Sequence, residues 1–277
     1  MDRKIVYLNS IIIAFLTIIA TSSGLFWKGL YKNDAVSVMS MAMGQDLVTL
    51  VICVPILLAS CYLISRGSIR GRLMWMGTLF YFAYTYAIAS FMVSYNQLFL
   101  IYVALFSISL YTFLAGLLSL DVENIKASFS RGVTIKIAAV FSVIMGVLLA
   151  LMWLQMIIAS LLTGSDPSAL TGYATLVVQA MDLGVIVPAA IAAGLLLLKG
   201  NEWGYALTSI VLIKASLLGT AILSMIVFMA LNDVSTAFGQ ILFFMVLTAG
   251  GIIIAIAFYG KTNETVIHGT ITERATG

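Results

Sequence analysis

The sequence is poor in the side chains that carry most enzyme chemistry. It contains one histidine, His268 near the C-terminus, and two cysteines, Cys53 and Cys61. Haem ligation, most zinc sites and histidine-based acid–base catalysis need an imidazole beside the reacting atoms. The sequence also has no glycine-rich phosphate loop, Gly-x-Ser-x-Gly elbow or Cys-x-x-Cys pair. We therefore expect no enzyme activity, no catalytic residue, no metal site and no cofactor.

Charge is scarce as well. Charged residues make up 9% of the 277 residues and hydrophobic residues make up 62%, whereas a soluble domain usually carries about 25% charged residues. This composition predicts an all-α polytopic membrane protein, one membrane domain over residues 1–277 that is surrounded by the lipid bilayer. The net charge of +3 is spread over short loops, which predicts no nucleic-acid partner.

Long apolar runs dominate what is present. Eight of them are each long enough to cross a hydrocarbon core as a helix. The predicted spans are Ile5 to Trp27, Gly44 to Ile64, Leu73 to Val93, Leu98 to Leu120, Val133 to Leu162, Tyr173 to Leu198, Tyr205 to Leu231 and Ala237 to Tyr259.

The basic residues fall mainly on one side of these spans. Of the 14 Lys and Arg, Lys28 and Lys32 fall on one side and Lys214 falls within a span, which leaves 11 for the other side. Basic loops stay in the cytoplasm. We therefore expect both termini inside, with residues 263–277 as a polar cytoplasmic tail.

Two segments share a pattern. Residues 55–67 and 188–200 each begin with proline and, after ten intervening residues, end with a basic residue and glycine. Asp46 lies nine residues before the first proline and Asp182 lies six before the second. The pattern favours a parallel repeat of four plus four spans, with chance recurrence in a small membrane alphabet as the alternative. The halves would be residues 1–125 and 126–262.

Two acids are the leading site candidates. Asp182 lies roughly 13 Å into its span, where an acid usually faces a bundle interior or a wet cavity. It is predicted to hold a cation, a proton or an amine; a polar contact between helices is the alternative. Asp46, with Gln45 beside it, is interpreted as its counterpart, although it could simply favour the helix dipole. Together they predict an acidic vestibule open to the outside, with Asn96 at its rim.

Lys214 is the third charged candidate, as a switch. A depth mismatch of about 9 Å and the opposite lean of the two side chains argue against a direct salt bridge with Asp182. Large apolar residues share its helix face, while small residues lie opposite. The alternative is therefore a snorkelling lysine that faces lipid or another chain.

The third and fourth spans are rich in aromatic residues. Tyr84, Tyr86 and Tyr102 lie deep within them, and a buried phenol needs a hydrogen-bond partner. They are interpreted either as the lining of a pocket or as ordinary packing.

Four parts of the sequence form a recognisable set: Gln45-Asp46-Leu47, the segment from Arg66 to Leu73, the segment from Tyr95 to Phe106, and the segment from Asp182 to Tyr205. Together they resemble a family of uncharacterised prokaryotic multi-pass membrane proteins. The resemblance covers most of the chain and implies a prokaryotic cytoplasmic membrane. It brings no activity and no functional residues with it.

The pattern as a whole favours a transporter of a small cationic or polar solute, or of an ion, coupled to protons or cations. A non-transporting scaffold or subunit is the alternative, as a homo-oligomer or with Lys214 against an acid of a partner subunit. A retinal-binding lysine is a third, weaker one, because Lys214 is not in a final seventh helix. The candidate site residues are Gln45, Asp46, Tyr84, Tyr86, Asn96, Tyr102, Asp182 and Lys214.

Overall fold

A computed structural model of the chain describes residues 3–167, 169–170 and 173–263. Every regular element within these ranges is a helix, as the composition predicts. His268 and nearly all of the predicted tail lie outside the described residues.

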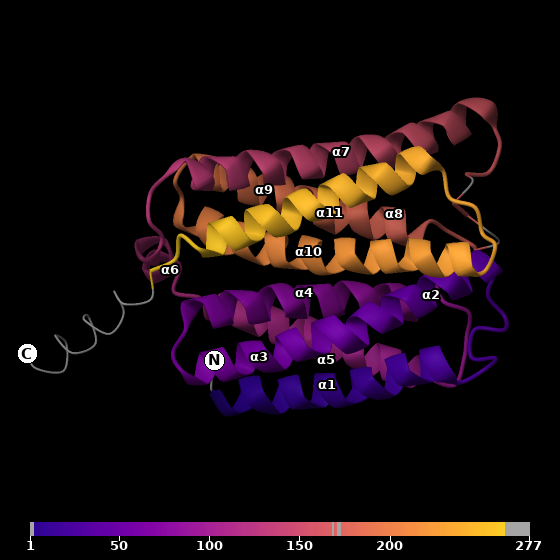
Figure 1. Cartoon of the computed structure of the whole chain (residues 1–277), viewed down its shortest axis with the longest axis horizontal. Coiled ribbons are helices and arrows are strands. Elements are labelled where there is room, and N and C mark those ends of the chain that lie inside the picture. Colours follow the sequence, from indigo (N-terminus) through magenta and orange to yellow (C-terminus); the bar gives the residue numbers. More distant parts are fainter. Residues whose placement is uncertain (1–2, 168, 171–172, 264–277) are drawn as a thin grey trace, which may run out of the picture.

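The helices form two groups that lie one above the other in Figure 1. The first contains α1 (Arg3–Phe26), α2 (Val36–Val48), α3 (Val54–Ser65), α4 (Ile69–Phe91) and α5 (Phe99–Leu118). The second contains α7 (Val133–Thr163), α8 (Val177–Met181), α9 (Val187–Leu198), α10 (Glu202–Leu231) and α11 (Phe238–Tyr259). The short α6 (Val122–Ser128) lies between them in the sequence.

In the described part of the chain, seven helices are long and apolar enough to cross a membrane. They are Arg3–Phe26, Val36–Ser65, Phe99–Leu118, Val133–Thr163, Val177–Leu198, Glu202–Leu231 and Phe238–Tyr259. The remaining predicted span coincides with α4, which has 23 residues, 14 of them buried. Its tyrosines and threonines make it less apolar than the others. A helix that neighbouring helices surround can carry such residues, because it meets little lipid.

Two predicted span boundaries are wrong. The second span begins at Val36 rather than Gly44, and the sixth begins at Val177 rather than Tyr173. The residues that precede Gly44 include serines and methionines, so they read as less apolar than a span although they are helical. The residues before Val177 form bends instead of a helix.

A widened helical turn interrupts the second and sixth apolar helices at the same place. The π-helical turn η1 (Thr49–Cys53) joins α2 to α3, and η2 (Asp182–Ile186) joins α8 to α9. Each ends one residue before Val54-Pro55 or Val187-Pro188 begins the next helix. Proline has no N–H and its ring crowds the carbonyl one turn earlier. The extra residue of a π-turn accommodates that interruption.

The helix α10 joins the two groups because it packs against α2 and α4 as well as α9 and α11. Glycines allow this close approach. A Cβ added to Gly44 of α2 would lie 2.5 Å from the Met225 Cα atom, and one added to Gly77 of α4 would lie 2.6 Å from the Ile213 Cβ atom. The interface between the groups is therefore packed almost at backbone contact.

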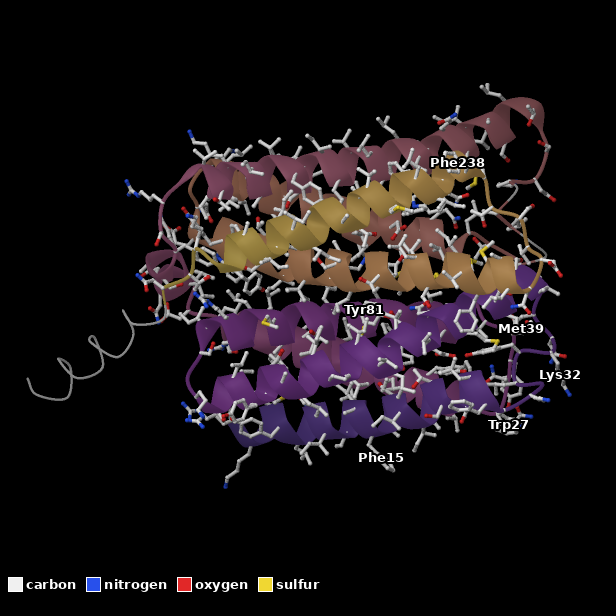
Figure 2. All side chains as sticks on the ribbon, viewed as in Figure 1. Phe15, Trp27, Lys32, Met39, Tyr81 and Phe238 are labelled. Atoms are coloured by element: carbon white, nitrogen blue, oxygen red, sulfur yellow. The ribbon has the colours of Figure 1, made fainter. Side chains whose placement is uncertain are left out.

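The two ends of the bundle differ in charge and in connections. Lys32 and Trp27 lie at one end (Figure 2). At the other end, α1 begins and α11 ends (Figure 1). There Lys126 of α6 pairs with Glu202 at 2.6 Å, and Arg70 donates a hydrogen bond to the Thr262 carbonyl. These contacts connect α4, α6, α10 and the residues after α11.

Candidate functional site

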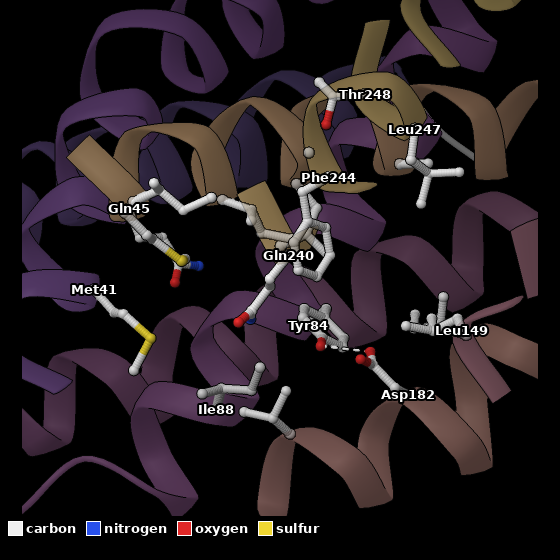
Figure 3. A pocket seen from close by; sticks show the side chains of 18 of the residues that line it. Met41, Gln45, Tyr84, Ile88, Leu149, Asp182, Gln240, Phe244, Leu247 and Thr248 are labelled. Atoms are coloured by element: carbon white, nitrogen blue, oxygen red, sulfur yellow. Dashed lines mark hydrogen bonds between the residues drawn. The ribbon is translucent and has the colours of Figure 1, made fainter. Parts of the chain in front are cut away.

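A cavity of about 370 Å³ lies between the two groups of helices. Side chains of α2, α4, α7, α8, η2, α10 and α11 line it, and most of them are apolar (Figure 3). On α10 the lining runs from Lys214 to Met229, about 22 Å at 1.5 Å per residue. Ser235, Ala237 and Gln240 line its far end and are exposed. The cavity is therefore deep, open at the loop between α10 and α11, and closed around buried charges.

Asp182 is the acid of this cavity. It is 5% exposed and is the first residue of η2. The Tyr84 hydroxyl donates a hydrogen bond to Oδ1 at 2.6 Å, drawn in Figure 3, and the Trp153 indole N–H donates one to Oδ2 at 2.8 Å. A buried carboxylate is costly unless hydrogen bonds satisfy it. Here each oxygen already has a donor, from α4 on one side and α7 on the other.

Lys214 is the basic residue of the cavity. It is 1% exposed, and its Nζ atom lies 3.9 Å from the centroid of the Tyr84 ring and 6.0 Å from that of Phe80. An ammonium over the face of an aromatic ring is attracted by the ring quadrupole. The alternative of a lysine facing lipid does not hold within this chain. The large residues on its helix face pack against the first group of helices, because α10 lies between the two groups.

Tyr84 connects the two charges. No ion pair joins Asp182 to Lys214, both of which are described residues; the Tyr84 ring lies under the ammonium while its hydroxyl reaches the carboxylate. The two side chains come from η2 and α10. A residue from α4 occupies the space between them. We call this arrangement of Lys214, Tyr84 and Asp182 the Lys214–Tyr84–Asp182 cluster.

Two amides add polar groups to the apolar wall. The Gln45 amide donates a hydrogen bond to the Thr85 hydroxyl at 2.9 Å, which holds Gln45 at the cavity surface on α2. Gln240 of α11 points its amide into the cavity (Figure 3). Both are within the lining, together with Tyr84, Asp182 and Lys214.

Asp46 lies elsewhere, so the structure does not bring the two acids into one vestibule. It is outside the lining, and its Oδ2 atom accepts a hydrogen bond from the Tyr31 hydroxyl at 2.7 Å. A Cβ added to Gly24 of α1 would lie 1.8 Å from that same oxygen. Successive helical residues point about 100° apart. Gln45 therefore faces the cavity while Asp46 faces α1.

Tyr31 holds Asp46 from the loop between α1 and α2. Burial raises the pKa of the Tyr31 phenol above its ordinary value, and the neighbouring Asp46 carboxylate and Tyr102 phenol raise it further. Tyr31 therefore keeps its proton and remains a hydrogen-bond donor to Asp46. This contact fixes a loop to a helix.

The remaining three predicted residues are also outside the lining. Tyr86 and Tyr102 stack on each other with ring centroids 6.3 Å apart and belong to the core of the first group. Asn96 accepts a hydrogen bond from the Leu98 N–H at 2.9 Å and so organises the turn before α5. Of the eight candidates, the cavity brings together Gln45, Tyr84, Asp182 and Lys214.

Sequence reasoning missed Trp153, Phe80 and Gln240. An indole in the outer part of a span is equally expected of an interfacial belt, so Trp153 gave no distinct signal. Gln240 lies at the start of a span, where polar residues are ordinary. Phe80 is one of many aromatic residues in its span. Only the packing of helices distant in sequence places Trp153 beside Asp182, Phe80 beside Lys214 and Gln240 in the same cavity.

Within the described residues, no three His, Cys, Asp or Glu side chains gather as a metal site would require. Comparisons of the chain with protein-family models, curated proteins and solved structures gave no match.

Proposed function

We propose that this chain is a membrane transporter for a small solute, and that the cavity between the two helix groups is its solute site. The observation that carries the proposal is the Lys214–Tyr84–Asp182 cluster at the closed end of that cavity. Ionisable groups inside a membrane are expensive and usually mark a substrate, ion or proton pathway. Here both lie beside a cavity with a wall of apolar side chains, which is the usual composition of a small-molecule site.

The transporter would have eight spans with both termini in the cytoplasm. The helix α4, with 23 residues, is about 34 Å long and so can cross a core of about 30 Å. The basic residues Arg70 and Lys126 are at one end of the bundle, together with the start of α1 and the end of α11. The positive-inside rule places that end in the cytoplasm. The cavity would then open to the outside.

The two groups would be parallel repeats that move against each other. The matching π-turns before Pro55 and Pro188 support this. In many transporters the substrate binds near the middle of the membrane between the repeats, and rocking of one repeat exposes the site to each side in turn. The contacts of α10 with α2 and α4 are the interface that would have to slide.

Asp182 would couple the movement to a proton or cation. Lys214, on the other side of Tyr84, balances the charge of Asp182. Protonation of Asp182 would therefore leave a net positive charge at the closed end of the cavity. The burial of Lys214, which is 1% exposed, favours this role over the scaffold alternative, in which the lysine would contact an acid of a partner subunit.

The test is flux into proteoliposomes that contain the purified chain and an entrapped pH-sensitive dye. A panel of small amines, amino acids, sugars and carboxylates is added outside. We expect at least one solute to cause protein-dependent proton movement that Asp182→Asn abolishes. Lack of flux with every member of the panel would count against transport. Undiminished, pH-independent flux in Asp182→Asn would remove Asp182 from the mechanism.

A further inference from the structure

We infer that the solute of this cavity has an apolar body and one anionic group, which binds Lys214, and that a proton enters onto Asp182 with it. The inference rests on the proposed function, since it names the class of molecule that the same cavity takes. It differs from the cationic solute that the two acids alone suggest.

The hydrogen bonds decide which of the two charges is available to a solute. Both Asp182 oxygens accept hydrogen bonds, from Tyr84 at 2.6 Å and Trp153 at 2.8 Å. A cationic solute could use only the remaining lone pairs of this carboxylate, and the nearby ammonium of Lys214 would repel it. The ammonium of Lys214, within the described residues, has ring contacts and neither a hydrogen bond nor an ion pair. Its N–H groups are therefore available to a solute.

Neutral donors lie farther along the cavity, toward its opening. The Gln240 amide points into the same space (Figure 3), and the Gln45 amide lines it from α2. Hydrogen bonds to an ionised group are shorter and stronger than those between neutral groups. The cavity thus offers a charged donor at its closed end and amides nearer its opening.

The apolar lining of the cavity indicates what the rest of the solute is like. The lining that continues along α10 from Leu218 through Ile222, Met225 and Met229 is apolar, as are Phe244 and Leu247 of α11. Burial of apolar surface is favourable in proportion to its area. Methionine side chains adapt to varied shapes, so the wall suits a flexible hydrocarbon better than a rigid polar ring.

Charge balance connects the anion to a proton. The ionisable side chains of the lining are Lys214 from α10, Asp182 from η2 and the phenol of Tyr84 from α4. The lining residues of α2, α7 and α11 carry none. Lys214 and Asp182 together are neutral, so a bound anion leaves one uncompensated negative charge in a medium of low dielectric constant. Transfer of one proton from water to the Asp182 carboxylate restores neutrality.

The experiment measures binding of octanoate to the full chain in lipid nanodiscs, by isothermal titration calorimetry, with protein-free nanodiscs subtracted. Octylammonium and octanol are the length-matched cation and neutral alcohol, and acetate is the anion without a body. We expect saturable binding of octanoate at a stoichiometry of one, and binding at least tenfold weaker for the other three. Equal or tighter binding of octylammonium would overturn the inference.

Variants of the cavity distinguish the contribution of the anionic group of octanoate to binding from that of its hydrocarbon chain. Lys214→Met should weaken octanoate binding at least tenfold, whereas Lys214→Arg should keep most of it because the charge remains. Ala42→Phe places a ring in the cavity lining and leaves both charges intact, so it should also abolish binding. This variant keeps the test decisive if Lys214→Met does not fold. Unchanged binding in Ala42→Phe, with monodisperse protein, would place octanoate elsewhere.

Titrations in two buffers with different ionisation enthalpies measure the number of protons that the protein takes up when octanoate binds. We expect about one proton taken up for each octanoate bound, and none in Asp182→Asn. No uptake by the unmodified chain would contradict the coupling. Octanoate binding that depends on Lys214 but gives no flux in proteoliposomes would keep this inference and remove the transporter. Flux of an amine that depends on Asp182 would keep the transporter and remove this inference.

Discussion

Aligning the two broken helices on their prolines shows that Asp182 has a neutral counterpart. Six residues before Pro188 is Asp182, and six residues before Pro55 is Thr49. Each is the first residue of its π-turn. Each also forms a hydrogen bond with a tyrosine of α4, Asp182 with Tyr84 at 2.6 Å and Thr49 with Tyr81 at 2.7 Å.

The comparison shows that two similar π-turns, each with a hydrogen bond to a tyrosine of α4, have different roles. Thr49 is 1% exposed and outside the cavity, so its hydroxyl pair with Tyr81 joins α4 to the second apolar helix. Asp182 keeps the same geometry but adds a charge where the cavity ends. Asp46, three residues farther from the proline than this position, is turned toward α1. Both charges of the cavity therefore come from the second half, and the first half contributes the Tyr84 hydroxyl, the Gln45 amide and part of the apolar wall.

The largest effect should come from making the second half like the first with Asp182→Thr. This variant leaves Lys214 buried without a compensating charge. A buried charge left without compensation costs about 3–5 kcal/mol, so we expect a marked fall in the thermal unfolding midpoint in detergent. The double variant Asp182→Thr with Lys214→Met removes both charges and should recover most of that loss. Additive losses in the double-mutant cycle would show that the two groups are not coupled.

The sequence predicts the helices and one acid of the site, because each depends on local pattern. Long apolar runs are helices in a membrane, and an acid in such a run stands out, as Asp182 does. The direction of Asp46 depends on a single step of 100° around the helix, and the π-turn alters that register. Trp153 contacts Asp182, and Gln240 enters the same cavity, only through packing of helices far apart in the sequence. That packing leaves no mark on the residues themselves.

The second prediction concerns the close packing around Asp46. Gly24→Ala would place a Cβ 1.8 Å from the Asp46 Oδ2 atom. The carboxylate or α1 must shift, and overpacking typically costs about 1–3 kcal/mol. We expect a lower unfolding midpoint but unchanged octanoate affinity, because Asp46 is outside the cavity. Gly250→Ala is the matched control, since its Cβ would lie at an ordinary 3.6 Å from a Phe141 ring carbon. A loss of octanoate binding in Gly24→Ala would move Asp46 into the functional site.

The third prediction separates the two tyrosine hydroxyls of α4. Tyr81→Phe and Tyr84→Phe each remove one hydrogen bond that is worth about 0.5–1.5 kcal/mol, or up to about 3 kcal/mol where the acceptor is charged. Both should lower stability, Tyr84→Phe somewhat more. Only Tyr84→Phe should shift the pH dependence of octanoate binding, because its hydroxyl contacts Asp182. Equal pH profiles for the two variants would mean that the hydroxyl of Tyr84 does not affect the proton on Asp182.

The smallest effect should come from the prolines themselves. Pro188→Ala restores an N–H, so the turn from Asp182 to Ile186 could close into a regular α-helix. Closure would rotate the Asp182 carboxylate away from Tyr84 and Trp153, but the hydrogen bonds from those two residues oppose it. We therefore expect octanoate affinity to fall only a few-fold in Pro188→Ala and not at all in Pro55→Ala. A difference in the opposite direction would indicate that the first π-turn, rather than the second, sets the shape of the cavity.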